Sequence, residues 1–201
     1  MSDLERWETR FGREDYHFGT EPNAFLADQA DRLPASGRAL AIADGEGRNG
    51  VWLAGQGLEV LSQDFSPAAQ AKARRLAEAR GVALRFERSD LRARDWEDAE
   101  YDVVAGIFFQ FLTPEERAPV FAAMKRALKP GGLLLIEGYG PRQMEYRTGG
   151  PGKPEHLYTP ALLRDAFGDM AQCDIRDHDA QVEEGAGHSG LSHLVDLVAV
   201  C

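Results

Sequence analysis

The chain has 201 residues, of which 43% are hydrophobic and 28% charged, the composition of a globular protein with one sizeable core. Its net charge of −10 disfavours binding to nucleic acid or to an anionic membrane surface, because both need a positive face. The two cysteines, Cys173 and Cys201, fit neither metal-ligand spacing nor a disulfide framework, so we expect no metal. The charged start and the lack of a long apolar run predict a cytoplasmic protein with no membrane contact.

The first 36 residues are amphipathic and rich in aromatic side chains, and they predict a helical lid. Residues 23–33 have a helical pattern with Asn23 as the N-cap. Trp7 and Phe11 are four residues apart, a spacing that favours packing of an N-terminal helix against the body. Tyr16 and Phe18 lie in a turn-like stretch, where we expect them to exclude water from a site.

From residue 37 to 138, strands and helices alternate. Strands are predicted at 38–43, 58–64, 82–90, 101–111 and 133–139, and helices at 47–57, 66–81 and 113–132, the last one ending in a Pro-Gly-Gly turn. This alternation is typical of a parallel sheet with helices on both faces. Right-handed crossovers would then place a ligand along one edge of the sheet.

The pattern changes after Tyr139. Residues 140–156 are rich in glycine and proline, residues 157–170 predict a short helix, and residues 171–184 and 191–200 predict an antiparallel hairpin. The expected fold is therefore α/β and doubly wound, with a mostly parallel seven-stranded sheet and an antiparallel last strand. We expect a single domain, 1–201, consisting of the lid (1–36), a cofactor-binding core (37–138) and a substrate-side loop, helix and hairpin (139–201).

Residues 39–54 contain the pattern G-x-G-x-x-G, formed by Gly45, Gly47 and Gly50, between a predicted strand and a predicted helix. Such a loop lets a ligand approach the backbone, and the helix offers free N–H groups. Asp64, nineteen residues after Gly45, ends the next strand and is placed to hold ribose hydroxyls. Alternatively, the glycines make only a tight turn and Asp64 caps the helix that begins at Pro67. Little chain remains for a separate catalytic domain, so an NAD(P)-dependent oxidoreductase is the less favoured reading of this loop.

Over nearly its whole length, the chain resembles class I S-adenosylmethionine-dependent methyltransferases. The segments that are similar to the family's successive motifs are "ALAIADGEGRN", "EVLSQDFS", "RSDL", "YDVVAGIFFQF" and "LKPGGLLLIEGY". In addition, "WETRFGREDYHFGTEPNAFL" resembles the N-terminal segment of tellurite-resistance and thiopurine-type methyltransferases. The short motifs "GEGRN", "TGGP" and "LYT" also occur in small bacterial relatives of the tellurite group.

The resemblance implies S-adenosyl-L-methionine as the cofactor, S-adenosyl-L-homocysteine as its product, and a small-molecule methyl acceptor, in a monomer or homodimer. The chain departs from the family at Ala41, where an acid is usual, and at Ala43, where glycine is usual. We expect Asp44 partly to replace the missing carboxylate; the alternative is that it only caps the helix.

Carried over by position, the resemblance assigns Asp64 to the ribose, Phe65 and Asp90 to the adenine, and Phe108 to the border of the methyl-sulfonium. The full set of expected cofactor-binding residues is Asp44, Gly45, Gly47, Asn49, Asp64, Phe65, Ser66, Asp90, Leu91, Ile107 and Phe108. The expected substrate and lid residues are Tyr16, Phe18 and Tyr146.

A general base is needed only if the nucleophile carries a proton at neutral pH. The candidates are His188, His17 and Tyr139, none of which is fixed by a motif. The chain has no Asn-Pro-Pro-Tyr motif and no evident catalytic cysteine, which favours a soft small nucleophile such as a thiol or a chalcogen oxyanion. A non-catalytic S-adenosylmethionine-binding protein also stays open as a hypothesis.

Overall fold

The computed structural model describes residues 2–201, which divide into two compact units. The first unit contains residues 2–94 and 184–187, and the second contains residues 95–183 and 188–201. No helix in the described residues is long and apolar enough to cross a membrane. The strands are β1 (Arg38–Ile42), β2 (Glu59–Asp64), β3 (Arg85–Arg88), β4 (Tyr101–Ile107), β5 (Leu128–Tyr139), β6 (Gln172–Glu184) and β7 (His188–Val200).

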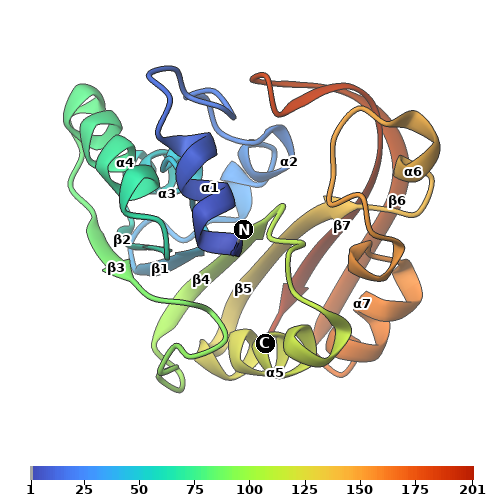
Figure 1. Cartoon of the computed structure of the whole chain (residues 1–201). Helices are drawn as coiled ribbons and strands as arrows, with labels where there is room; N and C mark the ends of the chain where they lie inside the picture. Colours follow the sequence, from blue (N-terminus) through green and yellow to red (C-terminus); the bar gives the residue numbers. More distant parts are fainter. Residues whose placement is uncertain (1) are drawn as a thin grey trace. The chain divides into compact units, whose positions relative to one another are not determined.

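The strands form a seven-stranded sheet in the order β3-β2-β1-β4-β5-β7-β6 (Figure 1). Strands β1, β2 and β3 pair in parallel, as do β4 and β5, whereas β7 pairs antiparallel with β5. The predicted doubly wound α/β sheet with an antiparallel last strand is therefore confirmed. The helices are α1 (Asp3–Phe11), α2 (Ala24–Ala27), α3 (Arg48–Gly55), α4 (Pro67–Arg80), α5 (Pro114–Ala127), α6 (Gln143–Tyr146) and α7 (Pro160–Phe167), with 3-10 turns η1 (Ala30–Arg32) and η2 (Pro154–His156).

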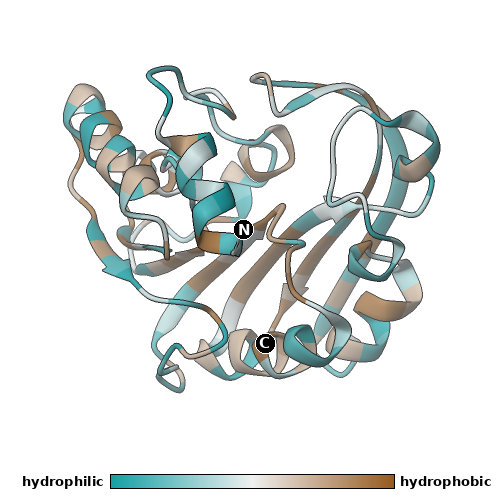
Figure 2. Ribbon diagram, viewed as in Figure 1, coloured by the Kyte–Doolittle hydropathy of each residue, from teal (hydrophilic) through white to brown (hydrophobic). Residues whose placement is uncertain are grey.

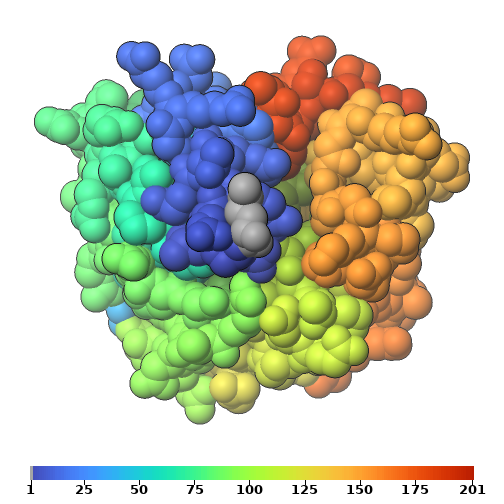
Figure 3. All heavy atoms as spheres, viewed as in Figure 1, coloured from blue at the N-terminus to red at the C-terminus, as the bar shows by residue number. Residues whose placement is uncertain are grey.

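In the first unit, α3 and α4 connect the parallel strands, and α1 packs against α4. Helix α4 begins where the sequence predicts it, because the Ser66 side chain accepts the N–H of Ala69 at 3.1 Å and Pro67 occupies the first turn. It ends at Gly81, which has a left-handed φ of 66°. Figure 3 shows the N-terminal segment, in blue, lying against the segment of α4.

In the second unit, the apolar run 133–136 of β5 is fully covered, as expected for a central strand. Figure 2 shows the contrast between the largely hydrophobic β5 and β7 and the hydrophilic β6. Helices α5 and α7 pack through Phe121 and Phe167, whose ring centroids are 5.0 Å apart. The core of this unit positions the ends of β4 and β5, which carry candidate site residues.

Several predicted elements have different bounds in the structure, including β3, which is only Arg85–Arg88, and β5, which already begins at Leu128. The helix expected over 23–33 stops at Ala27 and resumes only as the 3-10 turn η1. The strand expected over 101–111 ends at Ile107, because Phe108 takes a left-handed φ of 53° that turns the chain out of the sheet. The predicted Pro-Gly-Gly turn is instead part of β5, since Gly131 and Gly132 exchange backbone hydrogen bonds with Cys201.

Candidate functional site

The glycine loop occupies residues 43–47, between the end of β1 and the start of α3. Gly45 and Gly47 have left-handed φ values of 57° and 90°. A Cβ at Gly47 would lie 2.5 Å from the Cβ of Ala73 on α4, so only glycine fits there. Ala43 also has a left-handed φ, of 45°, at the position where the resemblance expects glycine. The loop is therefore closely packed and strained at a non-glycine residue, as backbone beside a binding site often is.

The carboxylate of Asp64 holds the loop to the end of β2. Its Oδ2 accepts the N–H of Gly45 at 2.9 Å, and its Oδ1 accepts the N–H of Ser66 at 2.8 Å. Burial raises the pKa of Asp64 to about 6, and these backbone N–H groups act against that rise. Each oxygen has further lone-pair capacity, so the carboxylate can still accept hydrogen bonds from a ligand.

Asp44 is directed to the first turn of α3 and to β2. Its Oδ1 accepts the N–H of Gly50 at 3.0 Å, and its Oδ2 accepts the hydroxyl of Ser62 at 2.6 Å. Burial raises the pKa of Asp44 to about 7. A Cβ at Gly50 would lie 2.3 Å from Asp44 Oδ2, which explains the third glycine of the pattern. The contact with Gly50 is the one expected if Asp44 caps helix α3. A role for Asp44 in binding the cofactor remains a prediction.

The ends of β2 and β3 lie side by side. The N–H of Ser89 donates to the carbonyl of Asp64 at 3.3 Å, and Gln63 donates its side-chain N–H to the carbonyl of Ser89 at 2.6 Å. Asp90 follows at once, with its Oδ1 accepting the N–H and Nε of Arg92 at 3.0 and 3.1 Å. The structure thus gathers, at two neighbouring strand ends of the first unit, the residues predicted for the adenosine: Asp64, Phe65, Ser66, Asp90 and Leu91.

Helix α1 is fastened to both of these strand-end loops. Glu8 accepts the Ser66 hydroxyl and, at 3.1 Å, the N–H of Ala68. At the start of the helix, Asp3 pairs with Arg92 at 3.3 Å, the same arginine that contacts Asp90. The sequence does not predict these anchors, because they join residues more than fifty positions apart.

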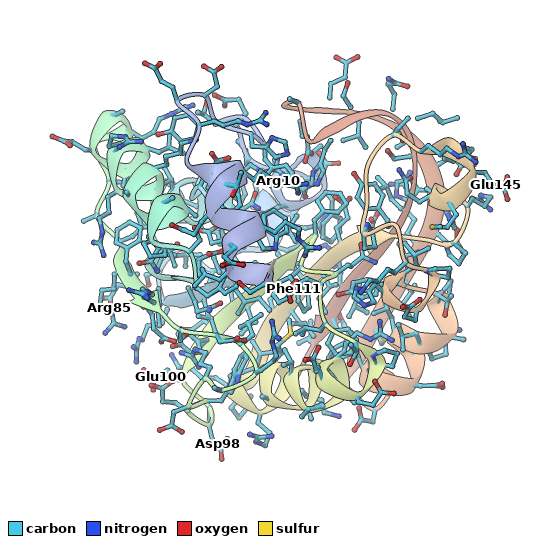
Figure 4. The ribbon with its side chains drawn as sticks, viewed as in Figure 1. Arg10, Arg85, Asp98, Glu100, Phe111 and Glu145 are labelled. Carbon is cyan, nitrogen blue, oxygen red and sulfur yellow. The ribbon has the colours of Figure 1, made fainter. Side chains whose placement is uncertain are left out.

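An aromatic cluster lies between α1 and the glycine loop. Trp7 stacks on Phe11 with centroids 5.1 Å apart, and Phe18 meets Phe11 edge-on at 6.2 Å. A Cβ placed on Gly45 would be 3.5 Å from the tip of Phe11. Arg10, labelled in Figure 4, lies over the Trp7 ring at 4.7 Å. Phe18 thus joins the helix residues Trp7 and Phe11 beside the loop, as a lid would require.

A buried ion pair lies beside the segment of His17 and Phe18, and sequence reasoning did not predict it. Glu46 Oε1 lies 2.7 Å from Lys72 Nζ, and both side chains are only 2% exposed. Glu46 Oε2 accepts the N–H groups of His17 and Phe18 at 2.8 and 3.3 Å. Two features of the sequence could have indicated this ion pair: Glu46 lies between two glycines of the loop, and Lys72 lies on the face of α4 that is buried.

Tyr16 anchors this segment on α4. Its hydroxyl donates to the carbonyl of Lys72 at 3.1 Å, and its ring packs against Val51, Leu76 and Ala77. These contacts pack Tyr16 against α4, and its expected role in excluding water from the site remains a prediction. His17 lies next to Phe18 at 4.6 Å, and burial together with the charge of Arg10 lowers the pKa of its imidazole.

Asn49 holds a neighbouring segment in place. Its Oδ1 accepts the N–H of Asn23 at 2.9 Å. Beside it, Arg48 pairs with Glu184 at 2.6 Å, and Glu184 also accepts the side-chain N–H of Asn23 at 3.0 Å. A cofactor contact by Asn49 remains a prediction, since the structure gives its side chain this other partner.

In the second unit, the structure brings together three of the predicted residues. Phe108 lies 4.7 Å from Tyr139 and 4.2 Å from His188 between ring centroids, and Tyr139 meets His188 edge-on at 5.6 Å. His188 begins β7 and is buried. We call Phe108, Tyr139 and His188 the aromatic wall. Ile107 precedes it as the last residue of β4.

Tyr146 does not join the contacts of the aromatic wall. It lies on α6, where burial raises the pKa of its phenol and hydrogen bonding links it to Asp179 and Arg142. Those partners pair with each other at 3.1 Å on the surface of the unit. A substrate role for Tyr146 therefore remains a prediction.

Gln110 holds Tyr139 of the aromatic wall in place through hydrogen bonds. Sequence reasoning did not predict this role of Gln110. Its Oε1 accepts the N–H of Tyr139 at 2.5 Å, and its Nε2 donates to the carbonyls of Tyr139 and His156 at 2.9 and 3.1 Å. Because one side chain satisfies both backbone groups of Tyr139, it fixes the end of β5 relative to the loop after β4.

Comparison with known proteins identifies the segment that contains the glycine loop. Residues 39–132 match a family model described as a methyltransferase domain. The matched segment includes Gly45, Asp64, Asp90 and Phe108, and all eleven of the predicted cofactor residues lie inside it.

Two of the curated proteins that resemble the chain carry the same name. The demethylmenaquinone methyltransferase of Thermus thermophilus is 36% identical over 106 residues, which cover 52% of this chain and 48% of that protein. The enzyme of the same name from Deinococcus radiodurans is 31% identical over 106 residues. The chain thus spans about half the length of the curated relatives it matches.

Solved structures share the fold across the chain. One, from work on the conversion of a disulfide bond into a thioacetal group during echinomycin biosynthesis, has a TM-score of 0.75 at 20% identity and covers 99% of this chain and 92% of its own. The phosphoethanolamine N-methyltransferase 2 of Haemonchus contortus, in complex with S-adenosylhomocysteine, has a TM-score of 0.72 at 16% identity, with 96% and 57% covered. The fold is that of S-adenosylmethionine-dependent methyltransferases, and these similarities do not favour an NAD(P)-dependent oxidoreductase. The narrower resemblance to the tellurite and thiopurine types remains a prediction.

Proposed function

We propose that the protein transfers a methyl group from S-adenosylmethionine to a small molecule, and that the acceptor is a soft nucleophile such as a thiol or a chalcogen oxyanion. One observation carries the proposal: the Asp64 carboxylate accepts the N–H of Gly45 at 2.9 Å, so the glycine loop and the ribose-binding acid form one hydrogen-bonded unit. The matched methyltransferase domain supports the same reading.

The residues of the first unit fit an adenosyl cofactor. Asp64 retains lone pairs for two ribose hydroxyls, and Gly45 and Gly47 leave backbone open to the methionine portion. Phe65 and Asp90 follow the ends of β2 and β3, where an adenine ring would lie. The bound cofactor would supply an already activated methyl group and a neutral leaving group.

The second unit offers an apolar surface for the acceptor. A rigid aromatic wall can orient a nucleophile, and orientation contributes ~7–11 kcal/mol in ideal cases. An anionic nucleophile and a cation lose their charges as they react, so excluding water lowers the barrier. If the nucleophile carries a proton, the imidazole of His188 in this wall is our candidate to accept it.

Calorimetry tests the cofactor. We expect S-adenosylmethionine and S-adenosylhomocysteine to bind and NADH not to bind. Binding of NADH without either adenosyl compound would overturn the proposal. A methyl-transfer screen with thiols and chalcogen oxyanions, followed by S-adenosylhomocysteine release, then tests the acceptor. Cofactor binding with no turnover on any acceptor would point to a non-catalytic binding protein.

A second acceptor class is favoured by the relatives. Two of the curated proteins that match are named demethylmenaquinone methyltransferases, so a quinol is the alternative acceptor. The same screen separates the two, because a reduced naphthoquinone would be methylated on carbon and a thiol on sulfur. Turnover of the quinol alone would replace the soft-nucleophile proposal.

A further inference from the structure

Three polar side chains lie together inside the second unit, and neither the family match nor the proposed cofactor site explains them. Glu137 of β5 is the direct cross-strand partner of Asp196 of β7. His178 of β6 places its Nε2 2.8 Å from Asp196 Oδ2. We call Glu137, Asp196 and His178 the polar layer. Glu137 and Asp196 are 3% and 4% exposed, so two carboxyl groups are buried within one sheet.

The polar layer is next to the aromatic wall on the same face of the sheet. Tyr139 and Leu194 are cross-strand partners two residues along from Glu137 and Asp196, and side chains two apart on a strand share a face. Tyr139 and Leu194 pack with Val182, Phe108 and Ala180. On this face of the sheet, the acidic pair of Glu137 and Asp196 is therefore directly next to the apolar pair of Tyr139 and Leu194.

Asp196 has a buried oxygen that the protein does not use. Its Oδ2 is engaged by His178, while its Oδ1 is buried and has no hydrogen-bond partner among residues 2–201. A buried carboxylate oxygen without a donor costs free energy that a ligand N–H or O–H can recover. The oxygen therefore indicates a donor that the chain itself does not provide.

A second pair on the same hairpin shows what a purely structural arrangement is like. His193 Nε2 lies 2.6 Å from Asp177 Oδ1, and its Nδ1 accepts the N–H of Arg142 at 2.9 Å. Arg142 also lies 3.7 Å from Asp177 Oδ1. In this pair, an arginine lies beside the carboxylate and both imidazole nitrogens have partners. The pair of His178 and Asp196 differs, because one oxygen of its carboxylate is buried without a hydrogen-bond partner.

We propose that Asp196, oriented by His178, binds a cationic N–H group of the methyl acceptor, such as an ammonium. The inference rests on the proposed function for the identity of the ligand as the acceptor, and among the acceptors proposed there it selects a thiol that carries an ammonium group, because a chalcogen oxyanion has no N–H. A cation is favoured over a neutral donor because the carboxyl groups of Glu137 and Asp196 lie opposite each other on neighbouring strands, and a charged donor forms the stronger hydrogen bond with a carboxylate. The nucleophilic atom then lies at another point of the same molecule, nearer the aromatic wall.

Three probes of equal size test the charge preference: benzylammonium, benzyl alcohol and benzoate. Each is titrated into the full chain saturated with S-adenosylhomocysteine, and binding is followed by NMR. We expect benzylammonium to bind at least about tenfold more tightly than benzyl alcohol, the gain of one charge-assisted hydrogen bond, and benzoate to bind least. Equal binding of benzylammonium and benzyl alcohol would overturn the proposal.

The variant Asp196→Asn should abolish the preference for benzylammonium, and the matched control Asp177→Asn should keep it. An unchanged preference in Asp196→Asn would refute the assignment. If thermal melting shows that Asp196→Asn is unfolded, His178→Ala takes its place, because it removes the imidazole that orients the Asp196 carboxylate. That variant should reduce the preference for benzylammonium, and an unchanged preference would count against the subsite.

The same titration keeps the two proposals apart. Failure of S-adenosylhomocysteine to bind would contradict the proposed function. The preference for benzylammonium, measured without the adenosyl compound, would still decide whether Asp196 recognises a cation.

Discussion

The backbone N–H of Gly45 donates to the carboxylate of Asp64 at 2.9 Å, and this bond couples the glycine loop to the acid that should hold the ribose. The same carboxylate takes the N–H of Ser66 at the start of α4. The Asp64 side chain thus fixes both the loop after β1 and the start of the helix after β2. Its loss should therefore weaken cofactor binding in two ways, by removing a hydrogen-bond acceptor and by releasing the glycine loop.

Asp64→Ala removes the acceptor for two ribose hydroxyls. We expect S-adenosylhomocysteine binding to weaken by ~1.5–3 kcal/mol, the range for hydrogen bonds to a charged group. Isothermal calorimetry measures the change, with Asp31→Ala, an exposed aspartate of η1, as the control. Equal affinity of Asp64→Ala and the natural chain would remove Asp64 from the cofactor site.

The buried acids make the stability of the free protein depend on pH. Burial raises the pKa of Asp44 to about 7 and of Asp64 to about 6, above the ordinary 3.8. Between about pH 4 and 7, the folded chain therefore binds more protons at these sites than the unfolded chain, so their contribution to the free energy of unfolding falls as pH rises. Urea unfolding across this range should show a shallower fall for Asp44→Asn than for the natural chain. Parallel pH profiles for the two proteins would contradict the assignment.

The ion pair of Glu46 and Lys72 should be costly to break. Glu46→Gln leaves the Lys72 ammonium buried without its charge partner, and such changes cost about 3–5 kcal/mol. Chemical denaturation gives the loss. Glu21→Gln, which removes an exposed partner of Arg80, is the control and should change stability by less than about 1 kcal/mol. If Glu46→Gln lowers the free energy of unfolding by no more than Glu21→Gln does, the buried ion pair does not contribute to stability as proposed.

Deleting residues 2–11 tests the lid. The deletion removes Glu8, Trp7 and Phe11 but keeps the turn that Glu46 holds. We expect methyl transfer to fall more than tenfold, because water enters the reacting site, while the melting temperature drops by only a few degrees. S-adenosylhomocysteine release and thermal melting are the two readouts. Intact turnover in the shortened chain would refute a lid role for α1.

Sequence reasoning predicted both ends of β1 and β2 to within one residue, because the glycine loop follows the first and the Ser66 cap with Pro67 follows the second, whereas β3 is shorter than predicted. It failed at the end of β4, where Phe108 takes a backbone conformation that an apolar run does not reveal. It also missed Glu46, Lys72 and Gln110, whose partners are far away in the sequence. Local patterns predict which residues end a strand, whereas the pairing of polar side chains inside the fold depends on tertiary packing.

The close approach of Gly50 to Asp44 has a consequence for natural variation. Any side chain at position 50 would displace the Asp44 carboxylate from the helix N-terminus and from the Ser62 hydroxyl. A shorter residue at position 44 removes that obstacle. In a set of homologous sequences, these two positions should therefore covary, with glycine at 50 strictly retained wherever aspartate stands at 44.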